Sequence, residues 1–201
     1  MVLFLLHIVI YITFAARTLL ESPMVTKIPI PEEARWQLSA RIAATLPVIY
    51  RAAFVDIIGD KYDRIEQQVW VVLAQEAKSL AKTYRLPVGT AKDLASTLDI
   101  ITTIFFGPEI KSEQVAFDED RAAILIKRCP LMLREESVYG EPGAAFNRCL
   151  AFSIAAVEAL NPAYTLRFVR STCQRDRNCE MKIARKDVVE AEEEAKIKKK
   201  R

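Results

Sequence analysis

The four cysteines of this 201-residue sequence, Cys129, Cys149, Cys173 and Cys179, are its side chains best suited to chemistry. Thiolates are soft ligands, and four of them suit a tetrahedral zinc ion or an iron–sulfur cluster. The interval between Cys173 and Cys179 is wider than that of a zinc knuckle. The residue types therefore predict a metal site made of all four cysteines, although their spacing matches no short metal motif.

Other interpretations of the cysteines stay open. A disulfide between Cys173 and Cys179 is sterically possible across a hairpin, but a reducing cytosol does not favour it. A buried cysteine such as Cys149 commonly serves as a small hydrophobic side chain. One thiol is alternatively a reactive nucleophile, because Arg128 and Arg148 each directly precede a cysteine. These arginines either lower a thiol pKa or face solvent.

The sequence offers little support for other catalytic groups. His7 is its only histidine and lies in an apolar N-terminal segment, so a Cys/His or Ser/His pair within the domain is nearly excluded. A thiol nucleophile would need another base, and a metal-activated water would need an open coordination position. The acidic residues 118–120 and 135–136 are typical of solvated turns. No catalytic residue can be assigned from the sequence.

The elements that must position the cysteines begin with helices. Apolar spacing predicts a helix over residues 31–58, with Pro47 kinking or dividing it, and a second over 60–85. A third helix is expected from Thr90, in a capping-box-like start, to about residue 106.

Two sets of residues in these helices have the spacing of a core. The first is a predicted buried stripe in the second helix, made of Ile65, Val69, Val72 and Leu73. The second consists of aromatic side chains, for which core packing is favoured over a ligand cage: Trp36, Phe54, Trp70, Phe105 and Phe106. A small-molecule pocket between the helices and a sheet remains possible.

The pattern changes in the second half of the chain. A β-branched apolar run before Cys129 predicts a strand, residues 140–162 predict a helix, and residues 164–173 and 179–185 predict a hairpin. Strands that return on a helix without βαβ repeats favour an α+β fold. We expect N-terminal helices packed on a small antiparallel sheet, with a C-terminal cysteine-bearing hairpin. If the strand before Cys129 lies beside this hairpin, all four sulfurs meet at one end of the sheet.

The order of elements and the segments AAILIKRCP, RCLAFSIAAVEALNP and VRSTCQRDRNCEMKI resemble the L-2-amino-thiazoline-4-carboxylic acid hydrolase-like family. They are distantly similar to 4-vinyl reductase-type small-molecule-binding domains. The resemblance covers residues 40–185 and is specific over about the last sixty of them. It implies hydrolytic opening of a cyclic thiazoline, and only the four cysteines match its pattern.

Charge and composition bound the partners. The net charge of +3 has much of its excess in the terminal KIKKKR, so no nucleic-acid footprint is expected.

Residues 1–23 are a short membrane anchor, a buried helix or an upstream extension with Met24 as the true start. The body is expected to be one α+β domain over residues 24–186, followed by a charged tail over 187–201 that is a solvated helix or disordered. The predicted location is cytoplasmic, tethered to a membrane only if residues 1–20 are retained.

Three functional hypotheses follow. The first is a cysteine-ligated zinc or iron–sulfur module that binds or senses a small molecule or transfers electrons. The second is a hydrolase that opens a sulfur-containing ring at a cyclic C–N bond. The third is an accessory subunit, tethered to a membrane or bound in a larger complex. The expected partners are a small molecule and, in a homo-oligomer or a complex, other protein chains.

Overall fold

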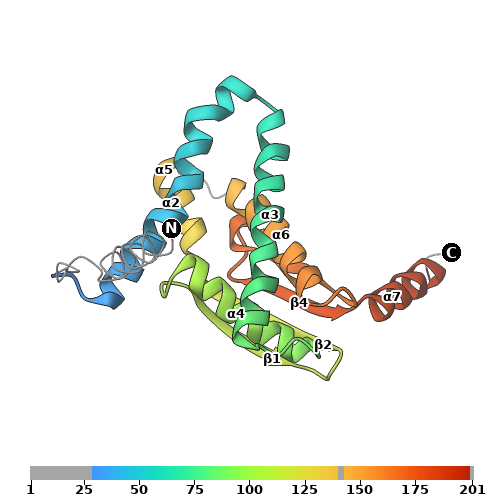
Figure 1. Cartoon of the computed structure of the whole chain (residues 1–201). Helices are drawn as coiled ribbons and strands as arrows, with labels where there is room; N and C mark the ends of the chain where they lie inside the picture. Colours follow the sequence, from blue (N-terminus) through green and yellow to red (C-terminus); the bar gives the residue numbers. More distant parts are fainter. Residues whose placement is uncertain (1–28, 140–142, 200–201) are drawn as a thin grey trace, which may run out of the picture. The chain divides into compact units, whose positions relative to one another are not determined.

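The computed structural model describes residues 29–139 and 143–199, so the N-terminal segment 1–23 with His7 lies outside the described residues. The chain divides into two compact units, residues 1–35 and 36–201. Within the described residues, three helices come first and two strands follow. Figure 1 shows them as α2 (Glu32–Ile58), α3 (Lys61–Tyr84), α4 (Ala91–Phe106), β1 (Lys111–Ala116) and β2 (Arg121–Arg128). The remaining elements are α5 (Pro130–Tyr139), α6 (Gly143–Leu160), β3 (Tyr164–Arg170), the 3-10 turn η1 (Thr172–Gln174), β4 (Cys179–Arg185) and α7 (Lys186–Lys199).

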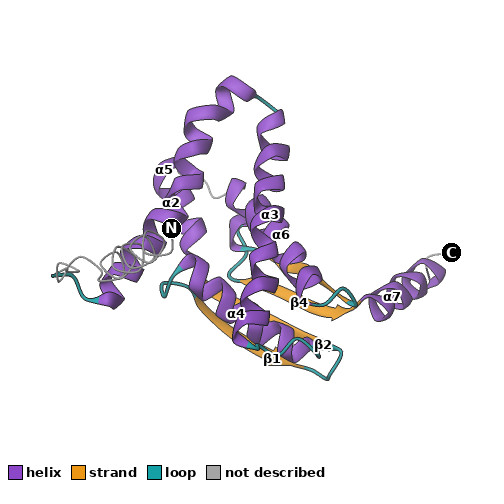
Figure 2. Ribbon diagram, viewed as in Figure 1, coloured by secondary structure: helices purple, strands orange, loops and turns teal. Residues whose placement is uncertain are grey.

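The four strands form one antiparallel sheet in the order β1-β2-β4-β3 (Figure 2). Ile124 on β2 lies opposite Met181 on β4, and Leu166 on β3 lies opposite Ile183. These side chains share one face and are almost fully buried, because successive strand residues point to opposite faces. The predicted α+β fold with a C-terminal hairpin is confirmed.

Helices α4 and α6 cover this apolar face, and α3 packs along α6. Trp70 of α3, Phe106 of α4 and Phe152 of α6 meet in the core, with the Trp70 and Phe152 ring centroids 6.2 Å apart. Within the described residues, α6 is the helix with the length and composition of a membrane span. Its position between α3 and the sheet explains this apolar composition, since it is a core helix.

Local signals fix the ends of α4. The predicted capping box is present: the Asp93 backbone N–H donates to Thr90 Oγ1 at 3.1 Å, and the Thr90 N–H donates to Asp93 Oδ2 at 3.0 Å. Gly107 follows the helix with φ of +86°, and a Cβ there would lie 2.6 Å from the Ala40 Cβ. Glycine at this position therefore allows the close approach of α2 to the end of α4.

The predicted core stripe of α3 is wrong. Ile65, Val69, Val72 and Leu73 are 51%, 60%, 69% and 37% exposed. The buried face carries a different set, with a charged residue among small and aromatic ones: Tyr62, Glu66, Trp70, Ala74, Ala77 and Ala81. The spacing identified a helix but assigned its faces incorrectly, because a second apolar face lies beside the buried one.

Other expectations also need correction. Trp70 and Phe106 are core residues as expected, whereas Trp36 and Phe54 are 40% and 45% exposed. The sequence did not predict β1 or α5. Proline at the first position of α5 begins the helix rather than ending the chain's regular structure. The charged tail is helical over α7, which is one of the two alternatives considered.

Candidate functional site

The fold brings the four cysteines to one end of the sheet. Ile126 near the end of β2 pairs with Cys179 at the start of β4, so Cys129 lies at the same end as Cys179. Cys173 lies in η1, which joins β3 to β4 and packs on α6, the helix that carries Cys149. All four are free thiols in this structure.

Burial controls the ionisation of these thiols. It raises the pKa of Cys149 far above the usual range, that of Cys173 to about 12, and that of Cys129. The other cysteines add smaller effects, and Cys129, Cys179 and Cys173 all act on Cys149. The four sulfurs therefore lie within electrostatic range of one another. Because three of the thiols are neutral at pH 7, a reactive thiolate is not favoured among them.

One of the sulfurs accepts a backbone hydrogen bond. Cys129 precedes α5, and the backbone of Met132 and Leu131 lowers its thiol pKa against the larger effect of burial. The Thr172 N–H donates to Cys179 Sγ at 3.3 Å, and the Thr172 hydroxyl lies 3.2 Å from the same sulfur. A backbone N–H donor to the sulfur is compatible with Cys179 as a metal ligand.

The thiol side chains are suited to a soft metal, but the four cysteines as arranged do not form a complete metal-binding site. Across residues 29–139 and 143–199, no three Cys, His, Asp or Glu side chains form a group that could hold a metal ion. Side chains or the loop around η1 would have to rotate for a common ion to be bound. The four-cysteine metal site stays a prediction.

A second constellation lies between the helices, where Arg148 of α6 is completely buried. Its Nη1 donates to Glu66 Oε1 on α3 at 3.1 Å, and its Nη2 donates to Glu135 Oε2 on α5. The side chains of Glu66 and Glu135 are 7% and 2% exposed. We call Arg148, Glu66 and Glu135 the buried triad.

Arg51 extends the buried triad to α2. Its Nη1 donates to Glu66 Oε2 at 2.9 Å, and its Nη2 lies 2.7 Å from Asp63 Oδ1. The Arg51 guanidinium also lies over the Tyr62 ring, 5.4 Å from its centroid. Burial raises the pKa of Glu66, and the attraction of Arg148 and Arg51 opposes that rise. The two oxygens of the Glu66 carboxylate on α3 thus bind Arg51 of α2 and Arg148 of α6, and so link the three helices.

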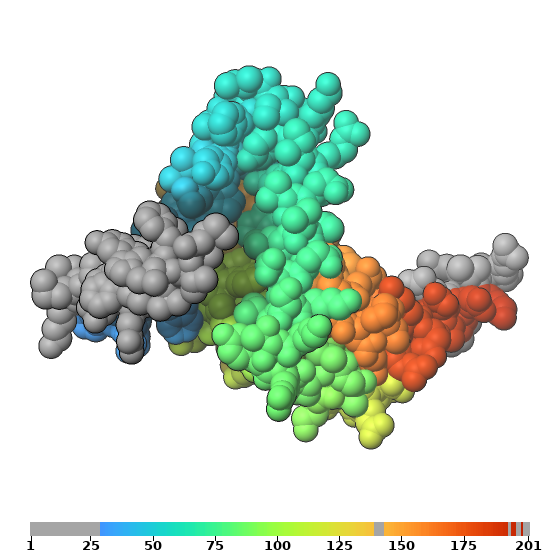
Figure 3. Space-filling model, in the orientation of Figure 1, coloured from blue at the N-terminus to red at the C-terminus, as the bar shows by residue number. Residues whose placement is uncertain are grey.

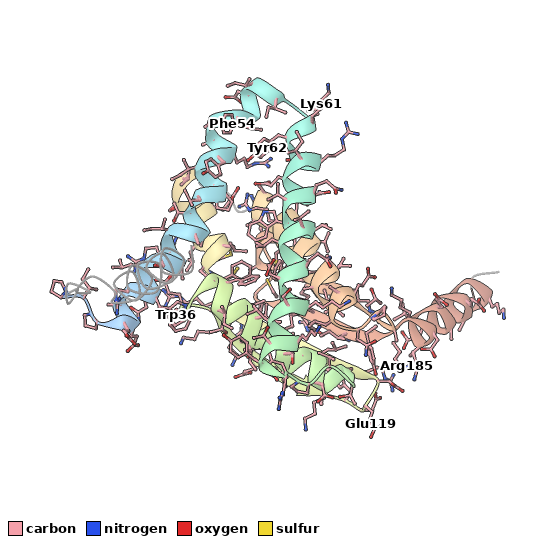
Figure 4. The ribbon with its side chains drawn as sticks, viewed as in Figure 1. Trp36, Phe54, Lys61, Tyr62, Glu119 and Arg185 are labelled. Carbon is pink, nitrogen blue, oxygen red and sulfur yellow. The ribbon has the colours of Figure 1, made fainter. Side chains whose placement is uncertain are left out.

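An apolar cavity that is open to solvent along much of its lining adjoins this carboxylate. It has a volume of about 330 Å³ and lies between α2 and α3, which form a helical hairpin. Its lining is apolar or aromatic apart from Glu66, and consists of Ala43, Leu46, Pro47, Tyr50, Tyr62, Ile65, Glu66, Val69, Trp70 and Leu73. Figure 4 shows Tyr62 at the start of α3 and Phe54 on α2, near the turn of the hairpin. The arrangement can hold a small apolar molecule with one polar contact.

The sequence interpretation missed the buried triad. Residues 135–136 were expected to be solvated, but Glu135 is buried. Arg148 was considered only as a neighbour of Cys149. A usable signal was present, because Arg148 interrupts the apolar stripe Ala145, Phe152 and Ala156, while Glu66 interrupts Tyr62 and Trp70. Opposite charges on the core faces of two helices indicate a buried ion pair.

No protein-family model and no curated protein matches the sequence. Among solved structures, the chain is similar to a trafficking protein particle complex subunit 3 from Naegleria fowleri covalently bound to palmitic acid. The TM-score is 0.51 at 12% identity, over 74% of this chain and 96% of that chain. It is also similar to the phenol-responsive sensory domain of the transcription activator PoxR with phenol. Here the TM-score is 0.51 at 14% identity, over 71% of this chain and 74% of that chain. At these identities the comparisons show a shared α+β fold.

Replacing Arg148 with methionine tests the buried triad. Arg148→Met leaves two carboxylates buried without their shared cation, so the free energy of unfolding should fall by about 3–5 kcal/mol at pH 7. The loss should shrink towards pH 5. In this variant Glu135 loses its cation and Glu66 keeps only Arg51. Protonation of these buried carboxylates then stabilises the folded variant as pH falls. Urea unfolding monitored by circular dichroism measures both effects.

The matched control is Arg128→Met, because Arg128 is exposed and also directly precedes a cysteine. This substitution should change the free energy of unfolding by less than about 0.5 kcal/mol. Equal losses in the two variants would contradict a structural role for the buried triad.

Proposed function

We propose that this domain binds a small, mainly apolar molecule in the cavity between α2 and α3 and acts as a sensory or accessory module. The observation that carries the proposal is the single buried carboxylate, Glu66, in an otherwise apolar lining. The volume of about 330 Å³ lies at the lower end of the roughly 300–1,000 Å³ range of ligand pockets.

The chemistry of Glu66 restricts the ligand. A carboxylate accepts hydrogen bonds at about four lone-pair positions. Arg148 and Arg51 take one position on each oxygen, so acceptor capacity remains for a donor on the ligand. A phenol, alcohol or amine matches this requirement, whereas an anionic ligand would be repelled. The structures of the same fold described covalently bound to palmitic acid and with phenol support the choice of an apolar ligand, and phenol combines an apolar ring with a donor.

Ring hydrolysis is the less favoured alternative. This alternative rests on the proposed resemblance to the L-2-amino-thiazoline-4-carboxylic acid hydrolase-like family. The order of elements and the cysteine-bearing hairpin support that resemblance. A thiol nucleophile would need activation, but burial raises the pKa values of Cys129, Cys149 and Cys173. We therefore place the function in binding rather than in hydrolysis.

The second candidate function is metal binding by Cys129, Cys149, Cys173 and Cys179, as zinc or an iron–sulfur cluster. Its specific support is the convergence of four thiols at one end of the sheet, with a backbone N–H donor to Cys179. The metal would hold the β3–β4 connection against α6 and the start of α5. Such a clip would be a structural part of the binding module.

Calorimetry with phenol tests the ligand proposal. Phenol should bind with saturation and change the fluorescence of Trp70, and toluene should bind about tenfold or more weakly because it lacks the donor. Benzoate, which carries a negative charge, should not bind. Ala43→Trp should abolish binding by filling the cavity.

The control for that substitution is Ala191→Trp on α7, an exposed alanine outside the cavity lining. It should bind phenol as the wild type does. If Ala43→Trp binds phenol with unchanged affinity, the proposed cavity is not the site. If neither phenol nor an aliphatic alcohol or amine of similar size binds the wild type, the proposal fails.

Metal analysis of anaerobically purified protein tests the cysteine proposal. Zinc or iron should be present in stoichiometric amount and should be lost in each of the four Cys→Ser variants. Zinc added to metal-free protein should release protons at pH 7, because burial raises the pKa values of Cys129, Cys149 and Cys173 and a metal binds the deprotonated thiol. The affinity should therefore rise with pH. Folded, colourless wild-type protein that contains no metal and binds none would contradict the prediction.

A further inference from the structure

Helix α2 is apolar on two sides. Ala40, Ala44 and Val48 form its buried side, with at most 6% exposure. The opposite side carries Ile42, Ile49 and Ile57, which are 60%, 50% and 79% exposed. A helix that is apolar around most of its circumference is normally buried on both sides. The described residues of this chain cover only one of them.

The uncovered side of α2 and the outer side of α3 make an extended surface. We define the hairpin face as Leu38, Ile42, Ile49 and Ile57 of α2 with Val69 and Val72 of α3, all between 46% and 79% exposed. Both helices lie at the surface in the space-filling view (Figure 3). The face adjoins the partly exposed residues at the cavity mouth, such as Leu46 and Ile65.

The size of this surface matches one half of a stable dimer. At about 100 Å² of apolar side chain per fully exposed leucine or isoleucine, the hairpin face together with Leu46 and Ile65 leaves roughly 450 Å² uncovered. A standard interface buries about 800 Å² per partner, of which about 57%, or roughly 450 Å², is non-polar. Patches of this size on a monomer mark interaction sites.

The charges beside the hairpin face are arranged for pairing with a second copy. Arg41 flanks one end of the α2 stripe and Asp56 the other, with Ile49 about midway between them. When two such helices pack antiparallel about a two-fold axis near Ile49, each Arg41 comes beside Asp56 of the other copy. The Arg41 side chain is 54% exposed and pairs with Glu109 at 3.2 Å, and its other N–H donors remain available to Asp56.

We propose that a second copy of this chain docks on the hairpin face, with its α2 antiparallel to α2 of the first. Each copy then covers the mouth of the other's cavity, so that the ligand site is complete only in the dimer. The dimer rests on the apolar face and its flanking charges, and does not depend on the proposed ligand. Light scattering shows whether the dimer forms, through the mass of the particle. Calorimetry shows separately whether the ligand binds, through the heat of binding.

Light scattering coupled to size exclusion tests the proposal on the full chain. The wild type should have twice the 22.8 kDa mass of one chain. Ile49→Asp and Ile42→Asp should each weaken the dimer by roughly tenfold or more, because each buries a carboxylate in the apolar interface. Circular dichroism should show that both variants stay folded, since these side chains are exposed in one copy. The matched control Val115→Asp, at an exposed position on the edge strand β1, should remain a dimer.

Three outcomes would overturn the proposal. The first is a wild-type chain that remains a monomer up to about 100 µM, well above the dissociation constants of specific dimers. The second is a chain starting at Met24 that dimerises while the full chain does not, which would show that the N-terminal segment covers the hairpin face. The third is a dimer that persists in both Ile49→Asp and Ile42→Asp, which would place the interface elsewhere.

Discussion

The burial of the Arg148 guanidinium is the constraint on which the arrangement of helices depends. A buried charge is tolerable only with partners of opposite charge and good hydrogen bonds. Arg148 finds them in Glu66 of α3 and Glu135 of α5, so three helices must meet around one side chain. Glu66 in turn holds Arg51 and thereby α2. Such a network need not add much stability, but it leaves the helices few alternative arrangements.

The same network gives the cavity its polar group. Trp70 and Tyr62 on either side of Glu66 make an apolar wall, and only the paired carboxylate breaks it. Without the two arginines, Glu66 would be protonated or would turn to solvent, and the cavity would lose its charged acceptor. Arg148 also lowers the pKa values of Cys129 and Cys173, against the larger effect of burial. One arginine therefore acts on both candidate sites, and α6 carries it between them.

Much of the fold could be predicted because it rests on local signals. The Thr90 capping box, the helix ending at Leu160 and the β3–β4 hairpin are written in short segments of sequence. The faces of α3 could not be assigned, because Ile65 and Val69 form an apolar stripe as regular as the buried one. Helix α5 was missed because Pro130 is equally consistent with a stop and with a first helical position.

The two candidate sites also differ in how well the sequence predicts them. The cysteines could be identified as candidate ligands from their chemistry. The pairing of β2 with β4 brings Cys129 and Cys179 to one end of the sheet, as expected if the strand before Cys129 lies beside the hairpin. The buried triad depends on contacts between residues as distant in sequence as Glu66 and Arg148, which no local pattern specifies. The sequence signal of the buried triad is a charged residue within the apolar stripe of each of two helices. This signal indicates an ion pair only when the two helices are compared.

The proposed ligand binding depends most on Glu66 being a buried, paired carboxylate at the wall of the cavity. Carbon-13 NMR of the Glu66 side-chain carboxyl, titrated with and without phenol, measures this directly. The titration midpoint should lie above the ordinary glutamate range, because burial raises the pKa of Glu66, and the chemical shift should change when phenol binds. An ordinary midpoint that phenol leaves unchanged, with no shift of the signal, would contradict the proposal.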